Sequence, residues 1–225
     1  MSARKRRPRL GWIVLLSVAG ALIVGAIATA LVLQLQGGKT DAAPASATPS
    51  AAAGSDGGGA GANGCLAGPG ITAEQLEQIR AKKDLTPTGA VEFLGAFTQF
   101  INAGDPNYRA GVERVVQDMT TGAAEGLFTN VSSVSGPAGG DNYNVDLSQG
   151  YYRVVTADPS KVVVDIMALS VRNGTPVSTG DGKLAIGGGE FTLIPSDTGW
   201  LVSAGSADVT FDQVRSTGYR FEDGC

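Results

Sequence analysis

Apolar residues follow three different patterns along this chain. An uncharged apolar run extends from Leu10 to Leu33, and the stretch from Gly37 to Gly64 then lacks large apolar residues altogether. From Ile71 onward apolar residues recur at helical spacing, and after about Gly126 they alternate as they do in strands. The pattern predicts a membrane helix, a linker and one α+β domain.

The run from Leu10 to Leu33 would form a helix of about 36 Å, which is enough to cross a bilayer core of about 30 Å. Five of the 17 basic residues precede it and no acidic residue does. The positive-inside rule therefore predicts a cytoplasmic tail over 1–9, a transmembrane helix over 10–35 and export of all that follows. A cleaved signal peptide is the alternative, because Ala28-Thr29-Ala30 has the small-x-small form. The continuation through Leu33 favours an uncleaved, single-pass anchor in the cell membrane.

The Ala- and Gly-rich segment 36–64 is predicted to be a disordered linker, because it has no large apolar side chain to bury. The only two cysteines, Cys65 and Cys225, bracket the exported domain predicted over 65–225. In an oxidising compartment this placement indicates a disulfide that joins the two ends of the domain. Two free or intermolecular thiols are the alternative.

Three helices are predicted at the start of this domain. Thr72 with Gln75 forms a capping-box pattern, Thr86-Pro87 opens a second helix, and Asp105-Pro106 opens a third. The second helix carries a wide apolar stripe, which is more typical of a core helix than of a cofactor site: Val91, Phe93, Leu94, Phe97, Phe100 and Ile101. A curved sheet is the expected partner of so broad a face.

Strands and turns are predicted for the rest of the chain. The expected strands are 127–134, 151–156, 161–171, 190–194 and 200–204, with hairpin turns around Asp158-Pro159 and Asp197-Thr198-Gly199. The segment 136–144 is expected to be a loop, and Gly187-Gly188-Gly189 a flexible connection between strands. The predicted fold class is α+β, a cone-like domain of about three helices packed on a curved antiparallel sheet.

The amino-acid composition excludes several kinds of catalytic and binding site. The chain has no His, which excludes Ser-His-Asp and Cys-His catalysis, His-ligated haem and most zinc sites. Beyond the anchor it carries 12 basic and 21 acidic residues, so direct nucleic-acid binding is not expected. The loop from Asp141 to Asp146 fails the EF-hand spacing in either register. We therefore expect no enzyme, and no catalytic, cofactor-binding or metal-binding residue.

Asp165 is the one charged residue inside the most apolar predicted strand. If its side chain pointed inward, burial would raise its pKa and could support proton-transfer chemistry. Period-two alternation instead places Asp165 with Val163 and Met167, on a face expected to be partly solvated, so a structural role is favoured.

Three segments together carry a family resemblance: 87–97, Tyr151-Tyr152-Arg153-Val154-Val155 and Gly199-Trp200-Leu201-Val202. They resemble exported domains with the fold of nuclear transport factor two. Anchor, linker and domain together are similar to the bitopic assembly-factor subunit of Gram-positive type IV secretion and conjugation systems. The resemblance implies a non-catalytic, membrane-anchored scaffold that docks to other membrane subunits of a secretion or transport complex.

Two other functions stay open at this point. One is an accessory subunit of a lipid or sterol importer of the mammalian-cell-entry type, whose members share the anchor and the fold. The other is a small-ligand-binding or isomerase-like domain that uses the cavity of the cone. The identity of the machine, the partners and a homo-oligomeric state are not determined by the sequence.

Overall fold

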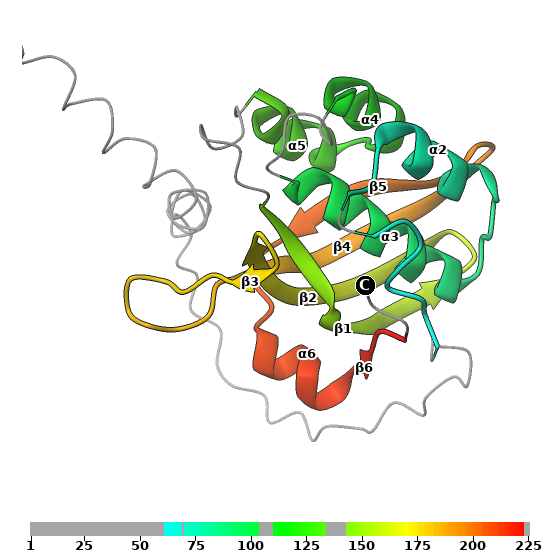
Figure 1. Cartoon of the computed structure of the whole chain (residues 1–225). Coiled ribbons are helices and arrows are strands. Elements are labelled where there is room, and N and C mark those ends of the chain that lie inside the picture. Colours follow the sequence, from blue (N-terminus) through cyan, green and yellow to red (C-terminus); the bar gives the residue numbers. More distant parts are fainter. Residues whose placement is uncertain (1–60, 69, 104–109, 134–142, 223–225) are drawn as a thin grey trace, which may run out of the picture. The chain divides into compact units, whose positions relative to one another are not determined.

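The computed structural model describes residues 61–68, 70–103, 110–133 and 143–222 (Figure 1). The predicted membrane helix, most of the predicted linker and Cys225 lie outside these residues. No helix within the described ranges is long and apolar enough to cross a membrane. The anchor therefore stays a prediction.

An antiparallel sheet organises the described part of the chain. Its strands are β1 (Tyr143–Asp158), β2 (Lys161–Arg172), β3 (Thr175–Pro176), β4 (Ile186–Ser196), β5 (Gly199–Ser206) and β6 (Tyr219–Arg220). Their order is β5-β4-β2-β1-β6, and β3 pairs with β2. Register shifts in β1 and between β4 and β5 bend the sheet. The two predicted hairpins, β1–β2 and β4–β5, are confirmed.

Helices cover both faces of this sheet. Four lie on one face, namely α2 (Ala73–Ala81), α3 (Pro87–Asn102), α4 (Val112–Met119) and α5 (Ala123–Ser133) (Figure 1). The fifth, α6 (Phe211–Thr217), lies on the other face, where Val214 packs on Met167 of β2. Ile166, which precedes Met167 in β2, points to the opposite face and into the main core. The fold is α+β as predicted, with five helices in the described residues.

Two of the three predicted helix starts are confirmed by their capping hydrogen bonds. The hydroxyl of Thr72 accepts a hydrogen bond from the backbone N–H of Gln75, and the Gln75 side chain accepts one from the N–H of Thr72. The hydroxyl of Thr86 accepts from the N–H of Gly89, with Pro87 at the first helical position. The six stripe residues that follow are all at most 6% exposed and form the core of the domain: Val91, Phe93, Leu94, Phe97, Phe100 and Ile101.

The prediction of a strand over 127–134 was wrong, because residues 127–133 belong to α5, while Val134 lies outside the described residues. Ala123, Ala124 and Glu125, which favour helix, start the helix upstream of the apolar residues. Phe128 then packs edge-on against Phe97, with ring centroids 5.1 Å apart. Contact with the core thus outweighs the strand preference of the apolar segment.

Two further boundaries differ from the prediction. The third helix begins at Val112, because Gly111 has a φ of +84° and interrupts helical backbone; Asp105 and Pro106 lie outside the described residues. Asn144, predicted in a loop, lies in β1.

The glycines 187–189, predicted to be a flexible connection, lie inside β4. A Cβ on Gly188 would lie 2.0 Å from the carbonyl oxygen of Ile166. A Cβ on Gly189 would lie 2.3 Å from that of Ser206. Glycine is needed here because β4 approaches its neighbours closely.

Candidate functional site

The space between α3 and the sheet is the place where a cone-shaped domain would hold a ligand, and aromatic rings fill it. Phe93 lies 6.0 Å from Phe97 between ring centroids, and Phe128 lies 6.3 Å from Phe191 of β4. In the same core, Tyr152 of β1 packs on Phe221, with ring centroids 4.7 Å apart. Because these side chains interlock, an organic substrate could enter only by displacing the core.

A small pocket lies at the rim of the domain, where α2 and the start of α3 meet β5. Its volume is about 50 Å³, whereas sites for organic ligands typically measure about 300–1,000 Å³. Polar side chains at this rim form hydrogen bonds with backbone groups of the same domain. Arg80 Nε donates to the carbonyl oxygen of Trp200 at 2.9 Å, and Trp200 Nε1 donates to that of Asp84 at 2.7 Å. The pocket suits water rather than a substrate.

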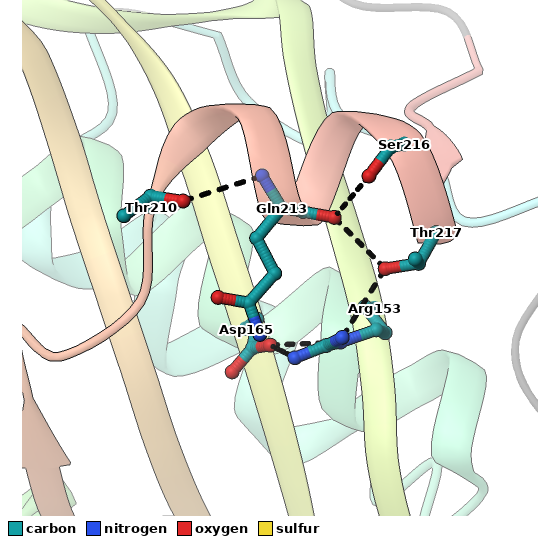
Figure 2. A network of polar contacts seen from close by, with 6 residues as sticks. All are labelled: Arg153, Asp165, Thr210, Gln213, Ser216 and Thr217. Carbon is teal, nitrogen blue, oxygen red and sulfur yellow. Dashed lines mark hydrogen bonds and ion pairs between the residues drawn. The ribbon is translucent and has the colours of Figure 1, made fainter. Parts of the chain in front are cut away.

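A buried ion pair lies beneath α6, on the opposite face of the sheet (Figure 2). Asp165 of β2 is 0% exposed, and its Oδ2 accepts hydrogen bonds from Nε and Nη2 of Arg153 on β1. Arg153 also donates to Thr217 Oγ1 of α6 through Nη1, at 3.2 Å. Asp165 Oδ1 has no hydrogen-bond partner in the described part of the chain. The pair thus ties β1, β2 and α6 together.

The alternation of residues predicted the correct face for Asp165 but the wrong degree of solvent exposure. Asp165 does share its face with Met167, yet this face is covered and not partly solvated, because α6 packs over it. Figure 2 shows Gln213 of α6 extending its side chain toward the carboxylate. A carboxylate that is fully buried against an arginine is poorly placed to exchange protons with a substrate. The geometry favours a structural role.

Sequence reasoning missed α6, although its start carries a readable signal. Thr210 and Gln213 have the same spacing as Thr72 and Gln75. The hydroxyl of Thr210 accepts a hydrogen bond from the N–H of Gln213 at 3.3 Å. The helix that follows has only seven residues, which leaves little periodicity for a sequence pattern to show.

The two ends of the domain are joined side by side. Asn63 and Glu222 form a parallel bridge, in which Gly64 N donates to Glu222 O at 2.9 Å and Glu222 N donates to Ala62 O at 3.0 Å. Ala62 is 0% exposed, and its N–H donates to the hydroxyl of Tyr152 at 3.1 Å. The ordered domain therefore begins before Cys65, within the last residues of the predicted linker. We call this pairing of 62–64 with 222 the terminal clasp.

The terminal clasp lies next to Cys65 in the sequence. Cys65 directly follows it, and the described residues contain no free cysteine. Cys225 comes three positions after Glu222 but lies outside the described residues. The Cys65–Cys225 disulfide stays a prediction.

Metal-binding clusters are absent from the described ranges, where no group of three or more His, Cys, Asp or Glu side chains could hold an ion. Asp141 and Asn142 of the acidic loop lie outside these ranges. Asp146 lies in β1 and stabilises the strand where its register shifts, since its Oδ1 accepts a hydrogen bond from Ser148 N at 2.9 Å.

Comparison with known proteins returns no relative for this chain. It has no significant match among protein-family models, curated proteins or solved structures.

Proposed function

We propose that this protein is a non-catalytic, membrane-anchored scaffold of a multi-subunit membrane complex, and that the complex is a type IV secretion or conjugative transfer machine. The exported domain would have the cone-like fold of nuclear transport factor two. It would bind other subunits through its surface. The N-terminus would lie in the cytoplasm, with the helix over 10–35 in the membrane.

The filled interior is the observation that carries this proposal. A binding or isomerase-like domain of this shape needs a cavity between the main helix and the sheet, with polar groups converging in it. Here Phe93, Phe97 and Phe128 occupy that space. Asp165, a charged residue that is 0% exposed, lies on the other side of the sheet and is bound by Arg153. Surface binding is therefore the better supported mode of action.

The terminal clasp also suits an anchored scaffold. The chain enters the domain at Ala62–Gly64, and these residues are hydrogen-bonded to Glu222 near the C-terminus. Tension applied through the linker would therefore act on both of these hydrogen bonds at once. A disulfide between Cys65 and Cys225 would make the junction covalent.

Crosslinking in intact cells tests the proposal. The full chain with an affinity tag at its N-terminus is crosslinked, purified from solubilised membranes and subjected to mass spectrometry. The proposal predicts enrichment of membrane subunits and ATPases of a transfer machine. Asp165→Asn should recover the same partners, whereas the core variant Phe97→Ala should lose them together with the fold.

Other outcomes point elsewhere. Enrichment of lipid permeases would support an importer subunit in place of a transfer machine. Recovery of no membrane partner would contradict the scaffold. A reporter that is active only outside the membrane, fused after Cys225, tests the topology separately, and activity of a cytoplasm-only reporter at that position would contradict the anchor orientation.

A further inference from the structure

Within the described residues, the outer side of β1 has no paired strand over its last six residues. β6 pairs with β1 only at Tyr151 and Tyr152. The following segment, Arg153–Asp158, has β2 on one side, and on its other side the described residues place no strand. No described loop donates or accepts a backbone hydrogen bond there. Figure 1 shows β6 as a short arrow beside the much longer β1. We call Arg153–Asp158 the open edge.

The opposite edge of the same sheet, formed by β5, is protected. The carbonyl oxygen of Trp200 accepts a hydrogen bond from Arg80 Nε, and that of Val202 accepts one from the N–H of Thr121. Natural sheets usually cover or charge their edges, because an uncovered edge offers hydrogen bonds to another strand. Within the described residues the two edges therefore differ, since β5 is covered at Trp200 and Val202 whereas the open edge has no backbone partner on its outer side.

The composition of the open edge suits strand pairing. Val154, Val155 and Thr156 are β-branched, and the segment contains neither Gly nor Pro. Val155 is 46% exposed, although it is a large apolar residue within a strand. Tyr219, which begins β6 next to this segment, is 50% exposed. An added strand would cover apolar surface as well as satisfy backbone groups.

The register of the open edge makes it self-complementary. If six residues pair antiparallel with the same six residues of a second copy, Arg153 must lie opposite Asp158 and Val154 opposite Ala157. Opposite residues in an antiparallel pair point to the same face of the sheet. In a regular strand, Arg153 and Asp158 would point to opposite faces, because five positions separate them.

A register shift between Val154 and Thr156 removes this mismatch. Arg153 lies opposite Asp165 on the face covered by α6, and Asp158 lies opposite Lys161, which is on that same face. On the other face, Ala157 lies opposite the core residue Val162. Val154 packs against the same core. The extra residue, Val155, therefore lets all four positions match in a self-paired strand.

We propose that two copies of this chain associate through their open edges, with the Arg153–Asp158 segments antiparallel about a two-fold axis. The two sheets then form one continuous sheet. Arg153 of one copy lies opposite Asp158 of its partner at both ends of the contact, while its guanidinium keeps its hydrogen bonds to Asp165 and Thr217 of its own chain. Val155 of each copy lies opposite Thr156 of the other, so the two Val155 side chains are diagonal neighbours across the axis. This goes beyond the proposed scaffold function and does not depend on it.

Charge substitution at Val155 tests the interface. The full chain is solubilised from membranes in detergent, and its protein mass is measured by light scattering after gel filtration. The parent should have twice the chain mass of 22.8 kDa. Val155→Lys should have the mass of a single chain, because it would place two lysines as diagonal neighbours across the two-fold axis. Leu184→Lys is the matched control, since Leu184 is 49% exposed but lies away from the open edge, and it should stay dimeric.

Mixing two variants of opposite charge distinguishes loss of the interface from loss of the fold. Val155→Glu should also be monomeric alone, and mixing differently tagged Val155→Lys and Val155→Glu chains should restore a dimer that contains both tags. A monomeric parent would overturn the proposal. So would a dimer that Val155→Lys leaves intact, or two variants that fail to combine while each melts like the parent. Because no partner subunit takes part, these outcomes are independent of the crosslinking test of function.

Discussion

Replacing the two members of the Arg153–Asp165 pair should destabilise the domain to very different degrees. Asp165 is 0% exposed, whereas the Arg153 side chain is 26% exposed. Arg153→Met leaves a buried carboxylate without a counterion, and within the described part of the chain its Oδ1 already has no hydrogen-bond partner. Removing one partner of a buried pair in this way costs about 3–5 kcal/mol. At about 2–4 °C per kcal/mol for a domain of this size, the melting temperature should fall by roughly 6–20 °C.

Asp165→Asn should cost less, about 1–3 kcal/mol, the usual penalty for a weakened or unsatisfied polar group. The amide oxygen can still accept a hydrogen bond from Arg153, and the guanidinium that loses its counterion can be hydrated because it is partly exposed. The double variant Arg153→Met/Asp165→Leu should be about as stable as the parent, because replacing a whole buried pair by apolar side chains is often neutral.

Thermal unfolding of the solubilised chain, followed by the fluorescence of the buried Trp200, measures all four proteins. The expected order of stability is parent, double variant, Asp165→Asn and Arg153→Met, with the first two close together. Equal losses from the two single variants would refute the reasoning, since the predicted asymmetry comes from their different burial. A double variant less stable than Arg153→Met alone would refute it as well.

Three further predictions concern the core, the termini and alkaline pH. Phe97→Ala should cost about 3–5 kcal/mol in unfolding free energy, because Phe97 is 1% exposed, while Leu184→Ala on the surface should change it by less than about 0.5 kcal/mol. Non-reducing mass spectrometry should find the Cys65 and Cys225 peptides linked, and two free thiols would contradict the bridge. Burial raises the pKa of Tyr152 above its ordinary value of 10.0, so the folded state holds this proton more tightly than the unfolded chain. Stability measured against pH should therefore fall as the pH rises above about 10, and less steeply in Tyr152→Phe.

The sequence alone predicted those elements whose formation depends on residues close together in the chain. Thr72 and Thr86 begin helices in the structure because a cap needs only a side-chain oxygen and the next three residues. The β1–β2 and β4–β5 hairpins close at the turns that the sequence indicates, for the same local reason. The apolar stripe of α3 also identified the core, since its period places large side chains on one face whatever they pack against.

Tertiary contacts decided the features that local signals could not. The segment around Phe128 is helical because it packs on α3, and the glycines before Glu190 lie in a strand because β2 and β5 approach closely there. Asp165 is buried only because α6, some 50 positions later in the chain, folds back over its face. A sequence pattern gives the face on which a side chain lies, but its exposure depends on which distant segment covers that face. For the same reason the open edge of β1 could not be inferred from sequence, since it follows from β6 ending after two residues.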